Sequence, residues 1–100
     1  MTKSIVQTTK EVCFLCGAST TVRHHIIHGR GQRQLSEAEG LWVYMCALHH
    51  HYLHNLPDHP HDAELKALAQ RKWIEQKKKE GYTNGQARGM WLNKFGKFFD

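Results

Sequence analysis

Cysteine and histidine are the residues of this sequence whose spacing carries the clearest chemistry. Cys13 and Cys16 are separated by two residues, and so are Cys46 and His49. Two such knuckles form a Cys3His ligand set, which suits the tetrahedral geometry that zinc adopts at structural sites. The alternative, in which the cysteines are only small buried residues, leaves the paired spacing unexplained. The pattern therefore predicts a structural Zn²⁺ ion bound by these four residues.

The fourth zinc ligand has to be chosen among three consecutive histidines, His49, His50 and His51. The spacing favours His49, because it repeats the two-residue gap of the first knuckle. A chain of 100 residues has a modest hydrophobic core, so a metal that cross-links two distant knuckles would contribute to its stability. The odd number of cysteines, three, also argues against a closed disulfide framework.

A second group of histidines remains after the zinc ligands are assigned. In a helix from Ala47 to about Asn55, His50 and His54 are four residues apart and share one face, where two imidazoles can bind one metal ion. His24 and His25 lie on a preceding strand, whose alternation sends them to opposite faces. One of these two histidines could bind a metal while the other acts as a general base. Each histidine alone could equally be an ordinary surface or core residue.

The elements that would position these ligands follow from hydrophobic patterning. The stretch from Ile5 to Val12 indicates a short strand or an extended arm, and the β-branched stretch from Thr20 to Ile27 predicts a strand. A second strand is predicted over 41–45, with three apolar residues on one face and both aromatic residues on the other. The helix over 47–55 follows directly. The central part of the chain is therefore predicted to be a ββα unit.

Capping signals define the remaining boundaries. Ser36 to Glu39 has the spacing of a capping box, which predicts a single helical turn that Gly40 ends. Asp62 is a candidate N-cap for a helix that ends in three lysines near Gly81, and the spacing from Thr83 to Gln86 predicts the start of a final helix. The apolar residues at helical spacing are Leu65, Leu68, Ala69 and Trp73 in the first of these helices and Ala87, Met90, Trp91 and Phe95 in the second.

The charge balance favours a polyanionic partner. Lysine and arginine exceed aspartate and glutamate by 14 to 9, which gives a net charge of +5. A small protein with excess surface lysine would have the same composition. No apolar run approaches the roughly 20 residues of a membrane span and the first residues lack a signal peptide, so we expect a soluble, intracellular protein. The candidate phosphate-binding residues are Arg30, Arg33, Arg71, Lys72, Lys77 and Lys78.

Three motifs together resemble the HNH endonucleases, the ββα-metal family, in the branch that carries a pair of zinc knuckles. They are CFLC at Cys13 to Cys16, RHHII at Arg23 to Ile27, and MCALHHHYLH at Met45 to His54. The flanking stretches GRGQRQLSEAEGLWVYMC, AQRKW and KFGKFF look like small phage-encoded HNH proteins, including recombination-enhancement nucleases. The resemblance implies an α+β fold with a small, zinc-stapled, treble-clef-like ββα-metal core and C-terminal helices.

Carried over by position, the resemblance implies a role for each histidine of the second group. His24 would bind the catalytic metal, His25 would be the general base, and His50 and His54 would be further metal ligands from the helix. The catalytic ion would be divalent: Mg²⁺, Mn²⁺, Zn²⁺ or Ni²⁺. Two positions depart from the family: His24 stands where aspartate is common, and the stretch before Cys46 reads Gly40-Leu41-Trp42 without the middle asparagine.

The resemblance extends over most of the chain from Cys13 onward and implies one HNH nuclease domain over residues 1–100. We predict an N-terminal arm over 1–12, the zinc knuckles and ββα core over 13–56, and a helical C-terminal part over 62–100. The leading hypothesis is a phage-encoded, metal-dependent DNA endonuclease that acts in the cytoplasm of a bacterial host cell, with a recombinase or other DNA-processing protein as a possible partner. A noncatalytic zinc module that binds DNA or protein is the alternative.

Overall fold

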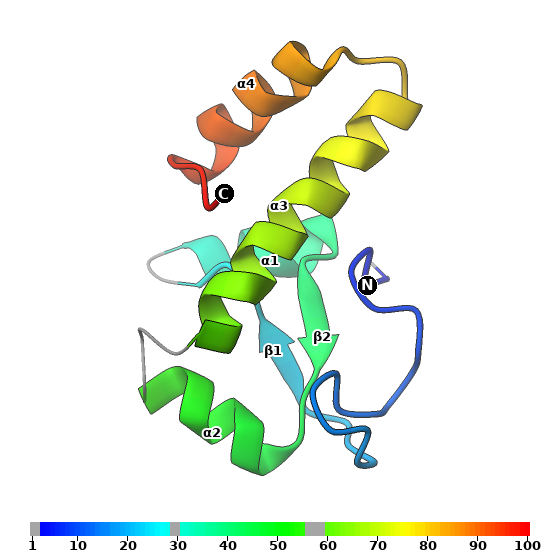
Figure 1. Cartoon of the computed structure of the whole chain (residues 1–100), viewed down its shortest axis with the longest axis vertical. Helices are drawn as coiled ribbons and strands as arrows, with labels where there is room; N and C mark the ends of the chain where they lie inside the picture. Colours follow the sequence, from blue (N-terminus) through cyan, green and yellow to red (C-terminus); the bar gives the residue numbers. More distant parts are fainter. Residues whose placement is uncertain (1–2, 29–30, 56–59) are drawn as a thin grey trace.

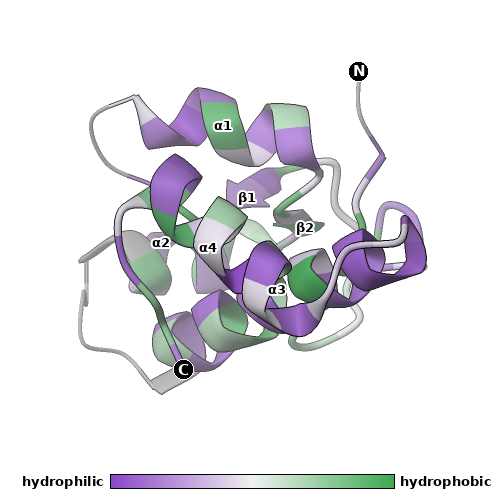
Figure 2. Cartoon of the chain, turned by 90° about the horizontal axis from the view of Figure 1, so that it is seen from above, coloured by the Kyte–Doolittle hydropathy of each residue, from purple (hydrophilic) through white to green (hydrophobic). Residues whose placement is uncertain are grey.

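The chain forms a small α+β structure in which a two-stranded sheet is combined with helices (Figure 1). The computed structural model describes residues 3–28, 31–55 and 60–100, so Arg30 lies outside the described residues, as does the side chain of His54. The elements, in chain order, are β1 (Arg23–His25), α1 (Gln32–Glu39), β2 (Trp42–Tyr44), α2 (Ala47–Asn55), α3 (Pro60–Lys79) and α4 (Asn84–Phe95). In the view from above, α1 and α3 lie on opposite sides of the strands (Figure 2).

Strands β1 and β2 are antiparallel, with His24 opposite Val43 and His25 opposite Trp42. Both strands are shorter than the predicted ranges 20–27 and 41–45, because regular pairing covers only three residues of each. The predicted alternation is confirmed. Leu41, Val43 and Met45 are completely buried on one face of the strand. Trp42 and Tyr44 share the other face, where their ring centroids are 5.1 Å apart. The predicted helix over 47–55 is also confirmed as α2.

The N-terminal arm is not a strand. Within the described residues 5–12, ladder pairing is limited to a single bridge between Val12 and Ser19. The arm instead covers the free edge of β2 with side chains: Ser4 Oγ donates to the carbonyl of Trp42, and the Tyr44 N–H donates to Gln7 Oε1 at 2.7 Å. These bonds satisfy strand-edge groups that would otherwise be open to another chain.

Helix α1 corrects the prediction of a capping box at Ser36. The helix begins at Gln32, and Ser36 lies within it with its side chain completely buried. Its hydroxyl accepts the N–H of Ile27 at 3.0 Å and donates to the carbonyl of Ile27 at 2.5 Å. The hydroxyl is therefore used to join α1 to the chain after β1, a long-range contact that local spacing does not reveal. The predicted helix end at Gly40 is confirmed, with φ of 74°.

Helices α3 and α4 pack against each other through aromatic residues. Trp73 of α3 packs edge to face against Trp91 of α4, with ring centroids 5.6 Å apart, and the ring centroids of Trp91 and Phe95 are 4.1 Å apart. The capping box formed by Thr83 and Gln86 at the start of α4 is confirmed. No helix in the described parts of the chain is both long enough and apolar enough to cross a membrane.

Asp62 is not the N-cap of α3, because the helix already begins at Pro60. The carboxylate is instead buried, with Oδ2 2.9 Å from Lys66 Nζ and Oδ1 3.5 Å from His28 Nε2. A second carboxylate, Glu39 at the end of α1, accepts hydrogen bonds from Trp73 Nε1 at 2.9 Å and Lys94 Nζ at 3.2 Å. These contacts connect α3 and α4 to the part of the molecule that contains the sheet.

Candidate metal centre and active site

The four predicted zinc ligands converge on one point. The ligand atoms of Cys13, Cys16, Cys46 and His49 all lie within 4.8 Å of one another. Cys16 Sγ is 3.8 Å from Cys46 Sγ, and His49 Nδ1 is 3.6 Å from Cys13 Sγ and 3.2 Å from Cys46 Sγ. A zinc tetrahedron with Zn–S bonds of about 2.3 Å has sulfur–sulfur edges of roughly 3.8 Å. The four residues are therefore positioned so that they could bind Zn²⁺.

Backbone hydrogen bonds position each knuckle. In the first, Gly17 N–H donates to the carbonyl of Cys13 at 2.8 Å, and Gly17 adopts the positive φ, 77°, that glycine accommodates. Phe14 N–H donates to the carbonyl of Tyr44 at 2.8 Å, which ties this turn to β2. Cys46 follows β2 directly, and His49 lies in the first turn of α2. A metal bound here would thus fix the start of α2 relative to the sheet.

The thiols of this group influence each other's ionisation. Burial alone raises the pKa of Cys13, but N–H donors from the backbone of Cys46, Cys16 and Leu15 and the bond with His49 outweigh it and lower the pKa to about 6. For Cys16, a hydrogen bond from the backbone of Ala18 lowers the pKa, but the neighbouring thiols raise it more, so that the pKa is raised overall. A cation among the thiolates would relieve this repulsion, as expected of a metal site.

His24 lies on the inner face of β1, where its side chain is completely buried. Its ring centroid is 5.6 Å from that of His50 on α2 and 6.1 Å from that of His28. His54 belongs to α2, but its side chain lies outside the described residues. Among the described side chains, only the Cys3His group has its ligand atoms within 4.8 Å of one another. The histidines around His24 are close neighbours but do not match that geometry.

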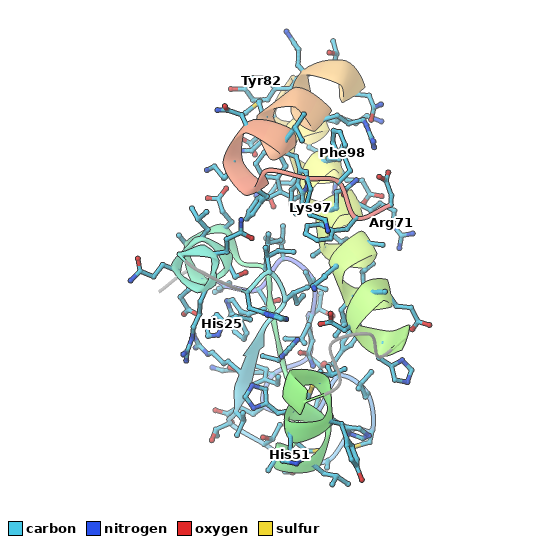
Figure 3. The ribbon with its side chains drawn as sticks, turned by 90° about the vertical axis from the view of Figure 1, so that its left-hand side faces the viewer. His25, His51, Arg71, Tyr82, Lys97 and Phe98 are labelled. Atoms are coloured by element: carbon cyan, nitrogen blue, oxygen red, sulfur yellow. The ribbon has the colours of Figure 1, made fainter. Side chains whose placement is uncertain are left out.

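His25 lies on the other face of β1, as strand alternation predicts, between β1 and α1 (Figure 3). Its Nε2 atom is 2.7 Å from Glu37 Oε2, and Glu37 Oε1 accepts a bond from Arg23 Nη1, also at 2.7 Å. The His25 side chain retains 15% of its exposure, so the ring is shielded but reachable from solvent. An ionised carboxylate only accepts hydrogen bonds, so Glu37 holds His25 with the proton on Nε2.

No family model, no curated protein and no solved structure matches this chain.

Three residues near the histidines have partners that the sequence does not predict. The capping-box spacing predicts no contact between Glu37 and a histidine, the N-cap prediction for Asp62 is wrong, and no role is predicted for His28. The signal for His28 was its place in the cluster with His24 and His25. Nothing in the local sequence indicates that Glu37 faces His25, because α1 is brought to β1 by the loop between them.

Five of the predicted phosphate-binding residues lie in the described part of the chain, on helices α1 and α3. Arg33 is exposed on α1, and Lys72 and Lys78 are exposed on α3. Lys77 is partly buried, with Nζ 5.1 Å from the ring centroid of Trp73 and 3.5 Å from a Glu80 oxygen. In Figure 3, Arg71 lies on the opposite edge of the molecule from His25. These residues are therefore not gathered at one site.

Proposed function

We propose that this protein is a metal-dependent endonuclease of the HNH type that hydrolyses phosphodiester bonds in DNA. The observation that carries the proposal is the approach of His24 on β1 to His50 on α2, with ring centroids 5.6 Å apart, beside the Cys3His group at the start of the same helix. The motif resemblance implies that a catalytic metal is bound by His24 of β1 and by His50 and His54 of α2. A divalent ion bound there would offset the charge that develops on the phosphate.

His25 is the proposed general base. Because its Nε2 donates to Glu37, Nδ1 is the nitrogen of the neutral ring that can accept a proton. His25 is the last residue of β1 and directly follows His24, the proposed metal ligand, in the chain. In the proposed reaction His25 takes a proton from water and the water oxygen bonds to phosphorus. The bond from phosphorus to the leaving oxygen breaks, and that oxygen takes a proton from solvent.

A noncatalytic zinc module that binds DNA or protein is the second candidate, and Gly40 favours it. Gly40 stands in the stretch where the resemblance would have its middle asparagine. A Cβ atom at this position would lie 2.4 Å from the carbonyl oxygen of Lys3, so the arm occupies the space that such a side chain needs. The arm therefore leaves no room at position 40 for the asparagine that this stretch lacks, and the absence of that side chain is compatible with binding without cutting.

The test is a plasmid cleavage assay with the zinc-loaded protein and added Mg²⁺, Mn²⁺, Zn²⁺ or Ni²⁺ in separate reactions. We expect nicked or linear product, and His25→Ala should reduce its rate by about 100-fold or more, the contribution usual for a general base. His51→Ala is the matched control, since His51 is exposed on α2 and has no role in the proposed site. Zinc content, circular dichroism and DNA binding should be unchanged in both variants.

The outcome of this assay separates the two candidates. Tight DNA binding without cutting under any metal would support the noncatalytic module. The flanking motifs support a phage-encoded protein linked to recombination in a bacterial host, so one further reaction adds a recombinase filament assembled on single-stranded DNA. Cutting that appears only with the filament, and disappears in His25→Ala, would support an endonuclease that requires this partner.

A further inference from the structure

A pocket of about 510 Å³ lies between the N-terminal arm and the outer face of the sheet. Its charged lining residues are Lys3, Lys10 and Arg23, its aromatic lining residues are Trp42 and Tyr44, and hydroxyl and amide side chains of the arm complete it. The arm runs along the β2 side of the sheet in Figure 1. Neither the zinc group nor the cluster around His24 contributes to this pocket.

The charged residues that line this pocket are cationic, and one of them, Arg23, is paired with Glu37 outside the lining. The lining contains three cationic side chains and no carboxylate. Lys3 and Lys10 are exposed, so their ammonium groups are accessible to a ligand. The Arg23 guanidinium has five N–H donors, of which Nη1 bonds to Glu37. The pocket is therefore suited to an anion that accepts several hydrogen bonds, such as a phosphate group.

Hydrogen bonds of the arm hold the wall of the pocket in place. Gln7 accepts the N–H of Tyr44 at 2.7 Å and donates through Nε2 to the carbonyl of Val12 at 2.9 Å and to Thr9 Oγ1 at 3.0 Å. Arg23 lies over the ring of Trp42, with Cζ 4.1 Å from the centroid. The two aromatic residues give the pocket an apolar floor beside its cations. The wall of the pocket and Arg23 are thus preorganised, which limits the entropy lost when a ligand binds.

The pocket is connected to the proposed general base through one carboxylate. Glu37 bonds to Arg23, a pocket residue, through Oε1 and to His25 through Oε2, both at 2.7 Å. Arg23 and His25 are two residues apart on β1 and face the same side of the sheet. A strand of nucleic acid that places one phosphate beside His25 can therefore place a neighbouring nucleotide in the pocket.

We propose that this pocket binds one nucleotide of a nucleic-acid strand, with the phosphate at Lys3, Lys10 and Arg23 and the nucleoside against the aromatic floor. The volume lies within the range of about 300–1,000 Å³ that is usual for small-ligand sites. The choice of nucleic acid as the polymer rests on the proposed function. Binding of the nucleotide unit itself does not require cutting, so the two proposals can fail separately.

The experiment is an NMR titration of the ¹⁵N-labelled, zinc-loaded full chain with deoxyadenosine monophosphate, deoxyadenosine or inorganic phosphate, without further metal. We expect the monophosphate to shift the backbone amide of Tyr44, the side-chain amide of Gln7 and the indole N–H of Trp42, and to bind more tightly than either fragment. The double substitution Lys3→Gln/Lys10→Gln should raise the Kd for deoxyadenosine monophosphate roughly fivefold or more. The control Lys79→Gln/Lys97→Gln makes the same change in net charge at exposed positions outside the pocket.

Three results would overturn the inference: no shift of the pocket signals, equal binding of inorganic phosphate and the monophosphate, or equal weakening in the two double variants. A protein that binds the monophosphate in the pocket but cuts no plasmid would contradict the proposed nuclease activity alone. A protein that cuts plasmid but leaves the pocket signals unmoved would contradict the nucleotide pocket alone.

Discussion

The Nε2 atom of His25 lies 2.7 Å from Oε2 of Glu37, so strand β1 and helix α1 meet through a histidine–carboxylate pair. A carboxylate in this position fixes the orientation and the tautomer of an imidazole. Glu37 does not itself need to contact DNA to matter for cutting. It is a positioning residue in the proposed reaction.

Glu37→Gln is expected to reduce the kcat of plasmid cleavage by about 10- to 100-fold, the range usual for such supporting groups. KM should change less, because the substitution leaves the cations in place. Steady-state cleavage kinetics measure kcat and KM separately, and kcat should fall more than KM changes if Glu37 acts by orienting His25. Glu64→Gln, at an exposed glutamate on α3, is the control. An unchanged kcat in Glu37→Gln would exclude the positioning role.

Zinc binding should depend on His49 and not on its neighbour His51. We expect one Zn²⁺ per chain by mass spectrometry of metals in the wild-type protein. His49→Ala should weaken zinc binding and lower the Tm, whereas His49→Cys should retain the ion, because thiolate is an equally good zinc ligand. His51→Ala is the control. Retention of full zinc content in His49→Ala would show that another residue completes the ligand set.

Removal of zinc by a chelator tests the structural role of the same site. Because the group joins the turn at Cys13 to the start of α2, we expect loss of zinc to lower the Tm and to disturb the NMR signals of α2 before those of α4. Restoration of the spectrum by added Zn²⁺ completes the test. A chelated protein with unchanged Tm would contradict this role.

The carboxylate of Glu39 should make stability depend on pH in the acid range. Burial raises its pKa, but bonds from Trp73 and Lys94 outweigh burial and lower the pKa below the ordinary value of 4.5. A group whose pKa is lowered by folding stabilises the fold above its unfolded pKa, and this contribution is lost as pH falls through the folded pKa. Glu39→Gln should therefore cost on the order of 1 kcal/mol at pH 7 and less below about pH 4.

Urea unfolding of the wild type and Glu39→Gln from pH 7 to pH 3 measures this difference. Any effect of low pH on the rest of the protein, including the candidate zinc site, is shared by both proteins, so it cancels when the two free energies of unfolding are subtracted. A difference that does not change with pH would mean that the charge of Glu39 contributes nothing.

Gly40→Ala should destabilise the fold by about 1–3 kcal/mol or more. Gly40 has φ of 74°, and an added Cβ would lie 2.4 Å from the carbonyl oxygen of Lys3. Gly85→Ala in α4 is the matched control, because nothing lies within 4 Å of its added Cβ and alanine favours helix. Urea unfolding of both variants measures the effect. Equal stability of the two variants would mean that the arm does not pack on Gly40 in solution.

Short-range signals in the sequence determined a large part of the structure. The spacing of Cys13, Cys16, Cys46 and His49 identified four residues whose ligand atoms converge, because a knuckle presents both of its ligands from one turn. The helix over 47–55 and the capping box at Thr83 were also predictable, because the signals for each lie within a few residues of one another in the sequence.

Only the tertiary structure decided the roles of residues whose partners are distant in the sequence. Ser36 bonds to Ile27, Glu37 to His25, and Gln7 to Tyr44. Each of these pairs joins separate elements, so its geometry depends on how α1 and the arm pack against the sheet. The capping-box spacing at Ser36 cannot reveal its true role, because Ser36 lies inside α1, where its buried hydroxyl bonds to the backbone of Ile27. Local spacing thus identified the four residues that could bind a metal ion, and packing decided which side chains surround the histidines.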